Sequence, residues 1–299
     1  MKKKIPIKLT IVLIIIVAFF LGGYLPQLIQ KYIAKNQGKD NDPQLLTQKV
    51  IPQEGVNLNI SFGDSVLKMV EMGAIDKQKF DNIYKGRGGL TQDLASVFDG
   101  NSNTKITVNQ DNAGILLNLL WPLGLSNKTE FMNQSPMGKE YASDIENFAS
   151  TGGWTLGKVS GGKLFNNLPI VPLTREQEQI VAEISQNIYR PCCGNSTYFP
   201  DCNHGAAMLG FLYLAVSQGI PKDEIYKKAL ALNSYWFPQT YVELATYFEG
   251  MKDTAWNKVD PKEVLGAGYS SGQGYVAISK QLQEANLVPQ VSGGGSCSV

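Results

Sequence analysis

Residues 190–217 read RPCCGNSTYFPDCNHGAAMLGFLYLAVS, a cysteine-rich stretch that runs directly into a long apolar one. Gly194, Asn195 and Pro200 favour a loop in the first half of this stretch. The second half, from 205 to 217, contains no proline and no acidic or basic side chain, which is typical of a helix packed inside a protein. We therefore expect the cysteines to lie in a loop at the start of an apolar helix.

Helical periodicity continues on both sides of this stretch. Apolar residues recur every three or four positions in further segments, which predict helices over Asp64–Gly73, Asp76–Tyr84, Asn112–Leu120, Thr174–Tyr189, Asp223–Leu232 and Gln239–Phe248. The third of these is expected to end at Trp121-Pro122, because proline cannot donate the amide hydrogen bond that continues a helix. Only Lys105–Val108 and Tyr275–Ile278 favour short strands. The sequence therefore predicts a mainly α protein.

The N-terminus carries a long stretch without charge. Four lysines precede the run Leu9–Gln30, whose 22 uncharged residues are enough to cross a bilayer core as a helix. No A-x-A cleavage site follows, so residues 1–30 are predicted to be an uncleaved membrane anchor rather than a signal peptide. Three lysines follow the run, and the excess before it favours a cytoplasmic N-terminus. We expect a single-pass protein of the cell membrane with an extracytoplasmic body.

The rest of the chain is expected to divide into four parts. Residues 31–54 are polar and predict a linker, and 55–175 predict a helical subdomain without an assigned role. Residues 176–250 form a second helical subdomain that contains the cysteines, and 251–299 end in a glycine-rich tail.

Charge and motifs exclude two classes of partner. The 299 residues carry a formal net charge of +1 and no basic stripe of the kind that nucleic-acid binding needs. Gly152–Lys158 and Gly157–Lys163 match G-x4-G-K, but neither is followed by the serine or threonine that would coordinate magnesium, and no apolar strand precedes them. We therefore expect neither a nucleic acid nor a nucleotide as partner.

The rarest side chains are concentrated in one loop. Cys192, Cys193, Cys202 and the only histidine, His204, follow the spacing C-C-x8-C-x-H. Three thiolates and an imidazole are a common tetrahedral zinc set, and two thiolates with histidine also suit copper(I). A position at a helix start lowers the pKa of a thiol and so favours the thiolate that binds metal. We predict these four residues as ligands of copper or zinc.

A fourth cysteine lies in the terminal sequence SGGGSCSV. The glycines make a flexible tether, so Cys297 is predicted as a mobile extra thiol for the metal site. The alternative is an incidental cysteine in a disordered end.

Residues 180–233 resemble two families, through Pro191-Cys192-Cys193 and His204-Gly205 between helices. One is the membrane-anchored thiol oxidoreductases of cytochrome c maturation, although these carry C-x-x-C rather than adjacent cysteines. The other is the bacterial lipoproteins with a proline–cysteine motif followed by HG, although the sequence has no lipobox cysteine. The resemblance implies thiol chemistry in the cell envelope, with an envelope protein as client.

Three functions therefore stay open. The leading prediction is an anchored, extracytoplasmic protein that binds a thiophilic metal. The first alternative is a thiol–disulfide oxidoreductase, in which Cys192 or Cys193 attacks and Cys202 resolves. The second is a structural or interaction protein whose loop is stapled by a disulfide such as Cys193–Cys202.

Overall fold

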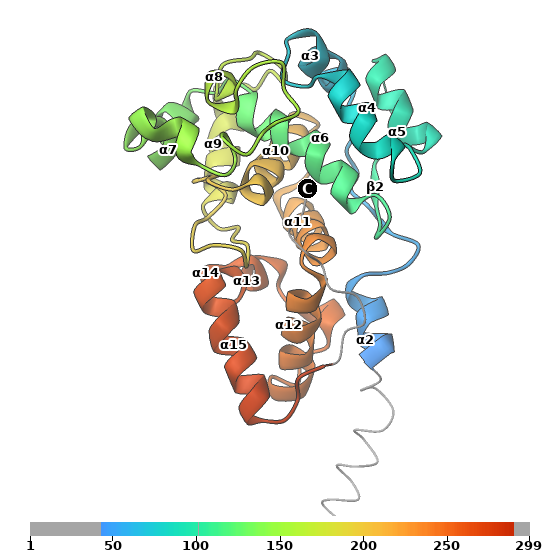
Figure 1. Cartoon of the computed structure of the whole chain (residues 1–299). Coiled ribbons are helices and arrows are strands. Elements are labelled where there is room, and N and C mark those ends of the chain that lie inside the picture. Colours follow the sequence, from blue (N-terminus) through green and yellow to red (C-terminus); the bar gives the residue numbers. More distant parts are fainter. Residues whose placement is uncertain (1–42, 101, 290–299) are drawn as a thin grey trace, which may run out of the picture. The chain divides into compact units, whose positions relative to one another are not determined.

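The computed structural model describes residues 43–100 and 102–289 (Figure 1). The predicted membrane anchor, residues 1–30, lies outside these ranges. Within them, no helix combines the length and the apolar composition that a membrane crossing requires. The chain divides into two compact units, 1–46 and 47–299, and the subdomains predicted from residue 55 onward all fall in the second unit.

The prediction of a mainly α protein is confirmed. In chain order, the α-helices are α2 (Pro43–Val50), α3 (Ser65–Glu71), α4 (Lys77–Lys85), α5 (Gln92–Ser96), α6 (Ala113–Ser126), α7 (Pro136–Lys139), α8 (Gly161–Leu164), α9 (Arg175–Ser185), α10 (Asn203–Ser217), α11 (Lys222–Trp236), α12 (Pro238–Met251), α13 (Pro261–Leu265), α14 (Ala267–Ser270) and α15 (Gly272–Glu284). Four short 3₁₀ turns lie at Val97–Asp99, Phe131–Gln134, Ala142–Asn147 and Trp256–Lys258. Strand β1 (Val56–Asn57) pairs antiparallel with β2 (Thr107–Val108), with Val56 opposite Val108.

Helices α6 and α10 form the centre of the second unit. All residues of α6 from Leu116 onward are buried, and so is α10 from His204 to Val216. A Cβ at Gly124 would lie 1.7 Å from the carbonyl oxygen of Ala206, and one at Gly210 would lie 2.2 Å from that of Leu120. The two helices therefore pack backbone against backbone, which only glycine allows at these positions.

Helix α6 corrects one prediction. It does not end at Trp121-Pro122 but runs through Pro122 to Ser126. Proline removes one hydrogen bond from the interior of a helix. Here the segment is buried on every side, and the Ser126 hydroxyl donates to the carbonyl of Pro122. Tertiary packing therefore outweighs the local preference.

The strand predicted at Tyr275–Ile278 is a second error, because these residues belong to helix α15. Ser271 caps this helix by accepting a hydrogen bond from the Gly274 N–H at 3.0 Å. Ile278 and Leu282 are its buried side chains, and their separation of four residues places them on one helical face. The strand predicted at Lys105–Val108 is present, but only as the short β2.

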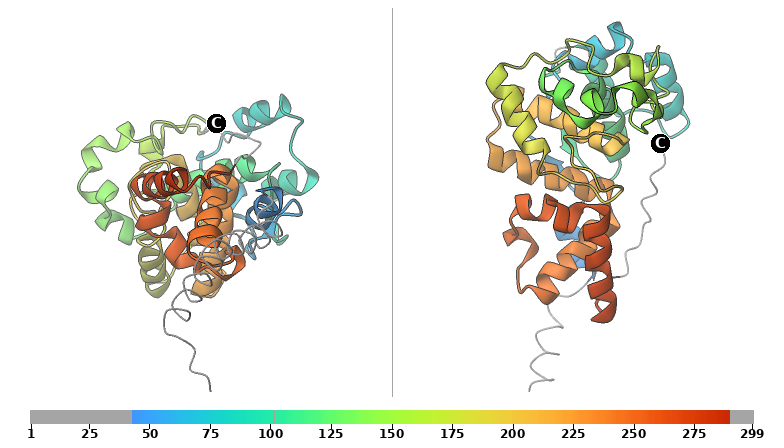
Figure 2. Two further views of the ribbon diagram at one scale, coloured as in Figure 1. Left: turned by 90° about the horizontal axis from the view of Figure 1, so that it is seen from below. Right: turned by 90° about the vertical axis from the view of Figure 1, so that its left-hand side faces the viewer.

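The cysteine loop, residues 186–202, connects α9 to α10. Helix α9 ends at Ser185 rather than near Tyr189, because Tyr189 pairs with Ser196 in an isolated antiparallel bridge. The Leu265 carbonyl accepts a hydrogen bond from the Tyr189 N–H at 2.8 Å, and the Asp201 carbonyl accepts one from Ser150 at 3.0 Å. The loop is thus bonded both to the C-terminal helices and to the segment that follows α7 (Figures 1 and 2).

Candidate metal centre

The loop brings three of the predicted ligands together. The sulfur atoms of Cys192, Cys193 and Cys202 all lie within 4.8 Å of one another, and those of Cys192 and Cys202 are 3.5 Å apart. All three cysteines are free thiols. Cys192 is exposed, whereas Cys193 and Cys202 are half-buried. The cluster therefore has one thiol at the surface and two behind it.

The backbone bends sharply so that neighbouring cysteines can face one site. The Cys193 N–H donates to the carbonyl of Arg190 at 3.4 Å, which closes a turn over Pro191. On the other side, the Gly272 N–H at the start of α15 donates to the Cys193 carbonyl at 2.8 Å. The C-terminal helices therefore hold the turn that presents Cys192 and Cys193.

Cys202 sits at the N-cap of α10. Its sulfur accepts a hydrogen bond from the Gly205 N–H at 3.4 Å, in the manner of an N-cap side chain. This position also places the sulfur at the positive end of a helix of 15 residues. The local backbone therefore contributes to the stability of a thiolate at Cys202.

Arg190 contacts the sulfur group through Cys202, and the sequence interpretation missed it. Its side chain is only 1% exposed, and Nε lies 3.1 Å from the sulfur of Cys202. Nη1 donates to the carbonyl of Asn195 at 2.9 Å, and Nη2 donates to that of Phe199 at 3.0 Å. Nη2 also forms an ion pair with Asp201. Each guanidinium nitrogen therefore has a partner from the loop, and the loop closes around it.

Two polar neighbours complete this arrangement. Asn195 Nδ2 donates to the second carboxylate oxygen of Asp201 at 2.8 Å. The thiol of Cys193 lies 3.8 Å from the other carboxylate oxygen of Asp201, Oδ1. Gly205 leaves the space that the guanidinium fills, because a Cβ there would lie 2.6 Å from Cζ of Arg190. The only sequence signal for this core was an arginine two residues before Cys192.

The three thiols differ in pKa. Hydrogen bonds from Cys192 and Cys193 lower the pKa of Cys202 well below its ordinary value, and Arg190 and the Gly205 N–H act in the same direction. Hydrogen bonding with Cys193 and Cys202 raises the pKa of Cys192. The lowered pKa therefore favours a thiolate at the half-buried Cys202, and the raised pKa favours a protonated thiol at the exposed Cys192.

His204 is not part of the sulfur group. Among the described residues, the cluster with metal-ligand geometry contains the three cysteines only. The imidazole is buried and packs on Phe237 and Trp236, with ring centroids 4.4 and 5.7 Å away. Residues two apart at a helix start project to different faces, which separates His204 from Cys202. Burial lowers the pKa of His204 to about 4. Cys297, the other predicted ligand, lies outside the described residues.

No protein-family model, curated protein or solved structure matches this chain. The resemblance of residues 180–233 to thiol oxidoreductases and lipoproteins therefore stays a prediction. The chemistry of the centre rests on its own geometry: three convergent thiols, a buried guanidinium and a helix N-terminus.

Proposed function

We propose that this protein binds a thiophilic metal ion through the thiolates of Cys192, Cys193 and Cys202. The observation that carries the proposal is the convergence of the three sulfurs within 4.8 Å. Metal–sulfur bonds of about 2.3 Å place coordinating sulfurs roughly 3.8 to 4.0 Å apart. A small rearrangement of the loop, in which the sulfurs of Cys192 and Cys202 move slightly apart from 3.5 Å, would therefore bring the three thiols to coordination distance.

The donor set favours copper(I) over zinc. Thiolates select soft metals, and copper(I) is satisfied by three of them. A structural zinc ion takes four ligands, and the imidazole of His204 lies on aromatic rings instead of near the sulfurs. Zinc would therefore need its fourth ligand from outside the group, for example from Cys297.

The surroundings suit an anionic metal–thiolate centre. Three thiolates and one univalent ion carry an excess of negative charge, which the hydrogen bond from Arg190 to Cys202 offsets. The Gly205 N–H adds a second donor to the same sulfur. Hydrogen bonds of this kind orient ligands and tune the metal that they hold.

A thiol–disulfide oxidoreductase is the second candidate, and the 3.5 Å between the sulfurs of Cys192 and Cys202 favours it. In that reaction the two thiols would become a disulfide while a client disulfide is reduced to two thiols. Reactive cysteines combine exposure with a low pKa. Here the exposed thiol, Cys192, has the raised pKa, and the thiolate of Cys202 lies behind it. This separation favours the metal over the redox reaction.

Localisation forms part of the proposal. An anchor over residues 1–30 would hold the centre at the extracytoplasmic face of the membrane, where an envelope protein would be its client. The support for this is the uncharged run Leu9–Gln30 with lysines on both sides.

The test is elemental analysis with thiol counting on the full chain, purified in detergent without added metal and under anaerobic conditions. The expected result is about one copper or zinc per chain. The metal should be lost in Cys202→Ser and kept in His204→Phe. Cys297→Ser distinguishes the two metals: bound copper should be retained, whereas bound zinc should be lost where Cys297 supplies the fourth ligand. A metal-free protein with two thiols missing would overturn the proposal and favour the disulfide.

A further inference from the structure

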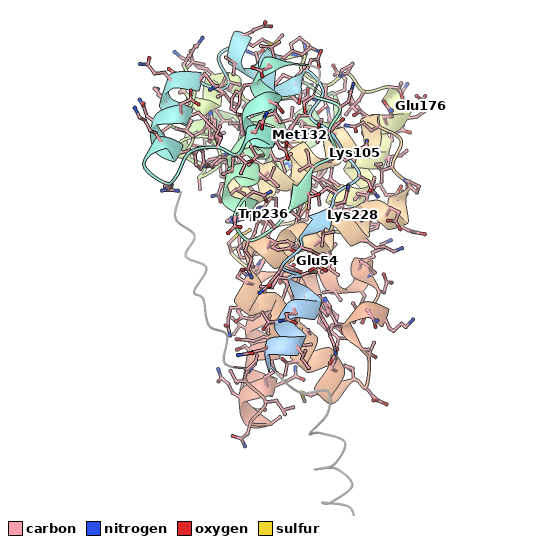
Figure 3. The ribbon with its side chains drawn as sticks, turned by 90° about the vertical axis from the view of Figure 1, so that its right-hand side faces the viewer. Glu54, Lys105, Met132, Glu176, Lys228 and Trp236 are labelled. Atoms are coloured by element: carbon pink, nitrogen blue, oxygen red, sulfur yellow. The ribbon has the colours of Figure 1, made fainter. Side chains whose placement is uncertain are left out.

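A cavity of about 690 Å³ lies away from the cysteines. Its walls are α4, α5, the segment that leads into β2, and the N-terminus of α6. Lys105, one of the lining residues, is labelled in Figure 3 on the side of the molecule that carries both strands. Volumes of about 300 to 1,000 Å³ are typical of pockets for small molecules. No cysteine lines this cavity, so it is independent of the metal centre.

Asn118 is an unsatisfied polar side chain in the wall of this cavity. It is only 3% exposed, and its Nδ2 donates to the hydroxyl of Tyr84 at 2.7 Å. Its Oδ1 has no hydrogen-bond donor among the described residues. Because a buried acceptor without a partner is unfavourable, Oδ1 is suited to a donor from a ligand once the amide of Asn118, a residue of the cavity lining, turns this buried oxygen toward the cavity.

The N-terminus of α6 borders the same space. No acceptor in the described ranges binds the N–H groups of Gly114 and Ile115, both of which line the cavity. The side chain of Asn112 does not cap the helix, because its Oδ1 accepts from Asn109 and its Nδ2 donates to Thr107. Free N–H groups at the start of a helix of 14 residues favour an anionic group.

Charged side chains surround this end of the helix. Arg87 and Lys105 are cations in the lining, and Asp93 and Asp111 are anions. In the part of the chain that the structure describes, none of the four forms an ion pair. A ligand with both an acidic group and a donor group would therefore meet complementary charge on this wall.

The two recognition features are one helical turn apart. Gly114 and Asn118 are separated by four residues, a rise of about 6 Å along the helix axis, and they lie on the same face. A molecule whose carboxylate and donor group are a few bonds apart can reach both. A Cβ at Gly114 would meet no atom within 4 Å, so the backbone there is open to the cavity.

We infer that this cavity binds a small carboxylic acid that carries an amino or hydroxyl group, an amino acid or a hydroxy acid. Its carboxylate accepts hydrogen bonds from the N–H groups of Gly114 and Ile115, with Lys105 and Arg87 as the nearby positive charges. Its amino or hydroxyl group donates to Asn118 Oδ1. The rest of the ligand fills the space between α4, α5 and β2.

The test uses the full chain and saturation-transfer NMR with a panel of L-amino acids and the matching 2-hydroxy acids. Each ligand that binds is compared with its analogue without the donor and with its carboxamide. Both analogues are expected to bind at least tenfold more weakly, and the amino and hydroxy series identify which donor Asn118 prefers. The inference fails when no member of the panel binds, or when the analogues bind as well as the parent acids.

Substitutions in the lining test whether the ligand binds in this cavity. Gly114→Leu fills the open space without a backbone clash and should weaken binding at least tenfold, as should Asn118→Leu. Gly268→Leu is the matched control, because a Cβ there also meets nothing within 4 Å and Gly268 lies on α14, away from the cavity. Binding that survives Gly114→Leu would show that the ligand sits elsewhere. An unchanged circular dichroism spectrum and melting temperature in all three variants report that the chain is folded.

Discussion

The cysteine loop and the cavity at the N-terminus of α6 differ in whether their buried polar groups have hydrogen-bond partners. In the loop, each guanidinium nitrogen of Arg190 has a partner, and the Cys202 sulfur accepts from both Arg190 and Gly205. In the cavity, the Oδ1 of Asn118 and the first free N–H groups of α6 have no partner among the described residues. The polar groups of the loop are therefore satisfied within the protein, whereas the cavity wall leaves an acceptor and donors available for a ligand.

The difference also concerns how each region is held. The loop depends on one buried cation that bonds to several of its own carbonyls, so its sulfur geometry and its stability are coupled. The cavity wall depends on α6, whose stability comes from packing against α10. Removing the guanidinium of Arg190 should therefore destabilise the protein strongly, whereas substitutions in the cavity wall should change the free energy of unfolding less.

The largest effect is expected from Arg190→Leu. This change leaves Asp201 without its partner and the carbonyls of Asn195 and Phe199 without donors. Removing one member of a buried ion pair costs about 3 to 5 kcal/mol. Denaturant unfolding of the reduced, metal-free protein measures this loss of free energy. A loss below about 1 kcal/mol would show that the loop does not depend on the guanidinium.

Lowering the pH should destabilise the protein somewhat less than Arg190→Leu does. The folded pKa of His204, about 4, lies below the ordinary value of 6.5, so below pH 6.5 the unfolded chain binds a proton that the folded chain does not. The free energy of unfolding should therefore fall as the pH falls from about 6.5 to about 4, by about 3 kcal/mol in total. The measurement is denaturant unfolding across this range. His204→Phe should lack this part of the pH dependence, and an unchanged slope in the variant would contradict burial of a neutral imidazole.

The smallest effects come from one substitution made at two helix starts. Gly205→Ala places a Cβ 2.6 Å from Cζ of Arg190 and should cost about 1 to 3 kcal/mol. Gly114→Ala meets no atom within 4 Å and should stabilise by up to about 1 kcal/mol, because alanine is the better helix former. Thermal unfolding of the two variants compares them directly. If both substitutions shift the melting temperature in the same direction, the contrast between the helix start filled by Arg190 and the open start of α6 is wrong.

The sequence predicted the parts of the site that depend on spacing. Glycine, asparagine and proline in 190–202 indicated a loop, and the apolar run after it indicated the helix that positions Cys202. The role of His204 depended on the direction of a side chain at a helix start, which the spacing C-x-H does not give. Arg190 was missed because arginine is rarely buried, so its type predicts a surface position.

The errors in the fold have related causes. Pro122 and Tyr275–Ile278 carry local signals against a helix, and packing in α6 and α15 overrides both. Asn118 offered a signal that was not used: it is the only polar side chain between Ile115 and Leu125. A lone amide in such an apolar run indicates either a buried hydrogen bond or a ligand site. Here the Oδ1 atom of the amide has no hydrogen-bond partner among the described residues.

The central claim is that three thiolates, without the histidine, form the metal centre. X-ray absorption spectroscopy of the metal-loaded full chain tests it most directly. The account predicts about three sulfur neighbours at about 2.3 Å and a spectrum that His204→Phe leaves unchanged. Imidazole scattering in the wild-type spectrum that disappears in His204→Phe would contradict it.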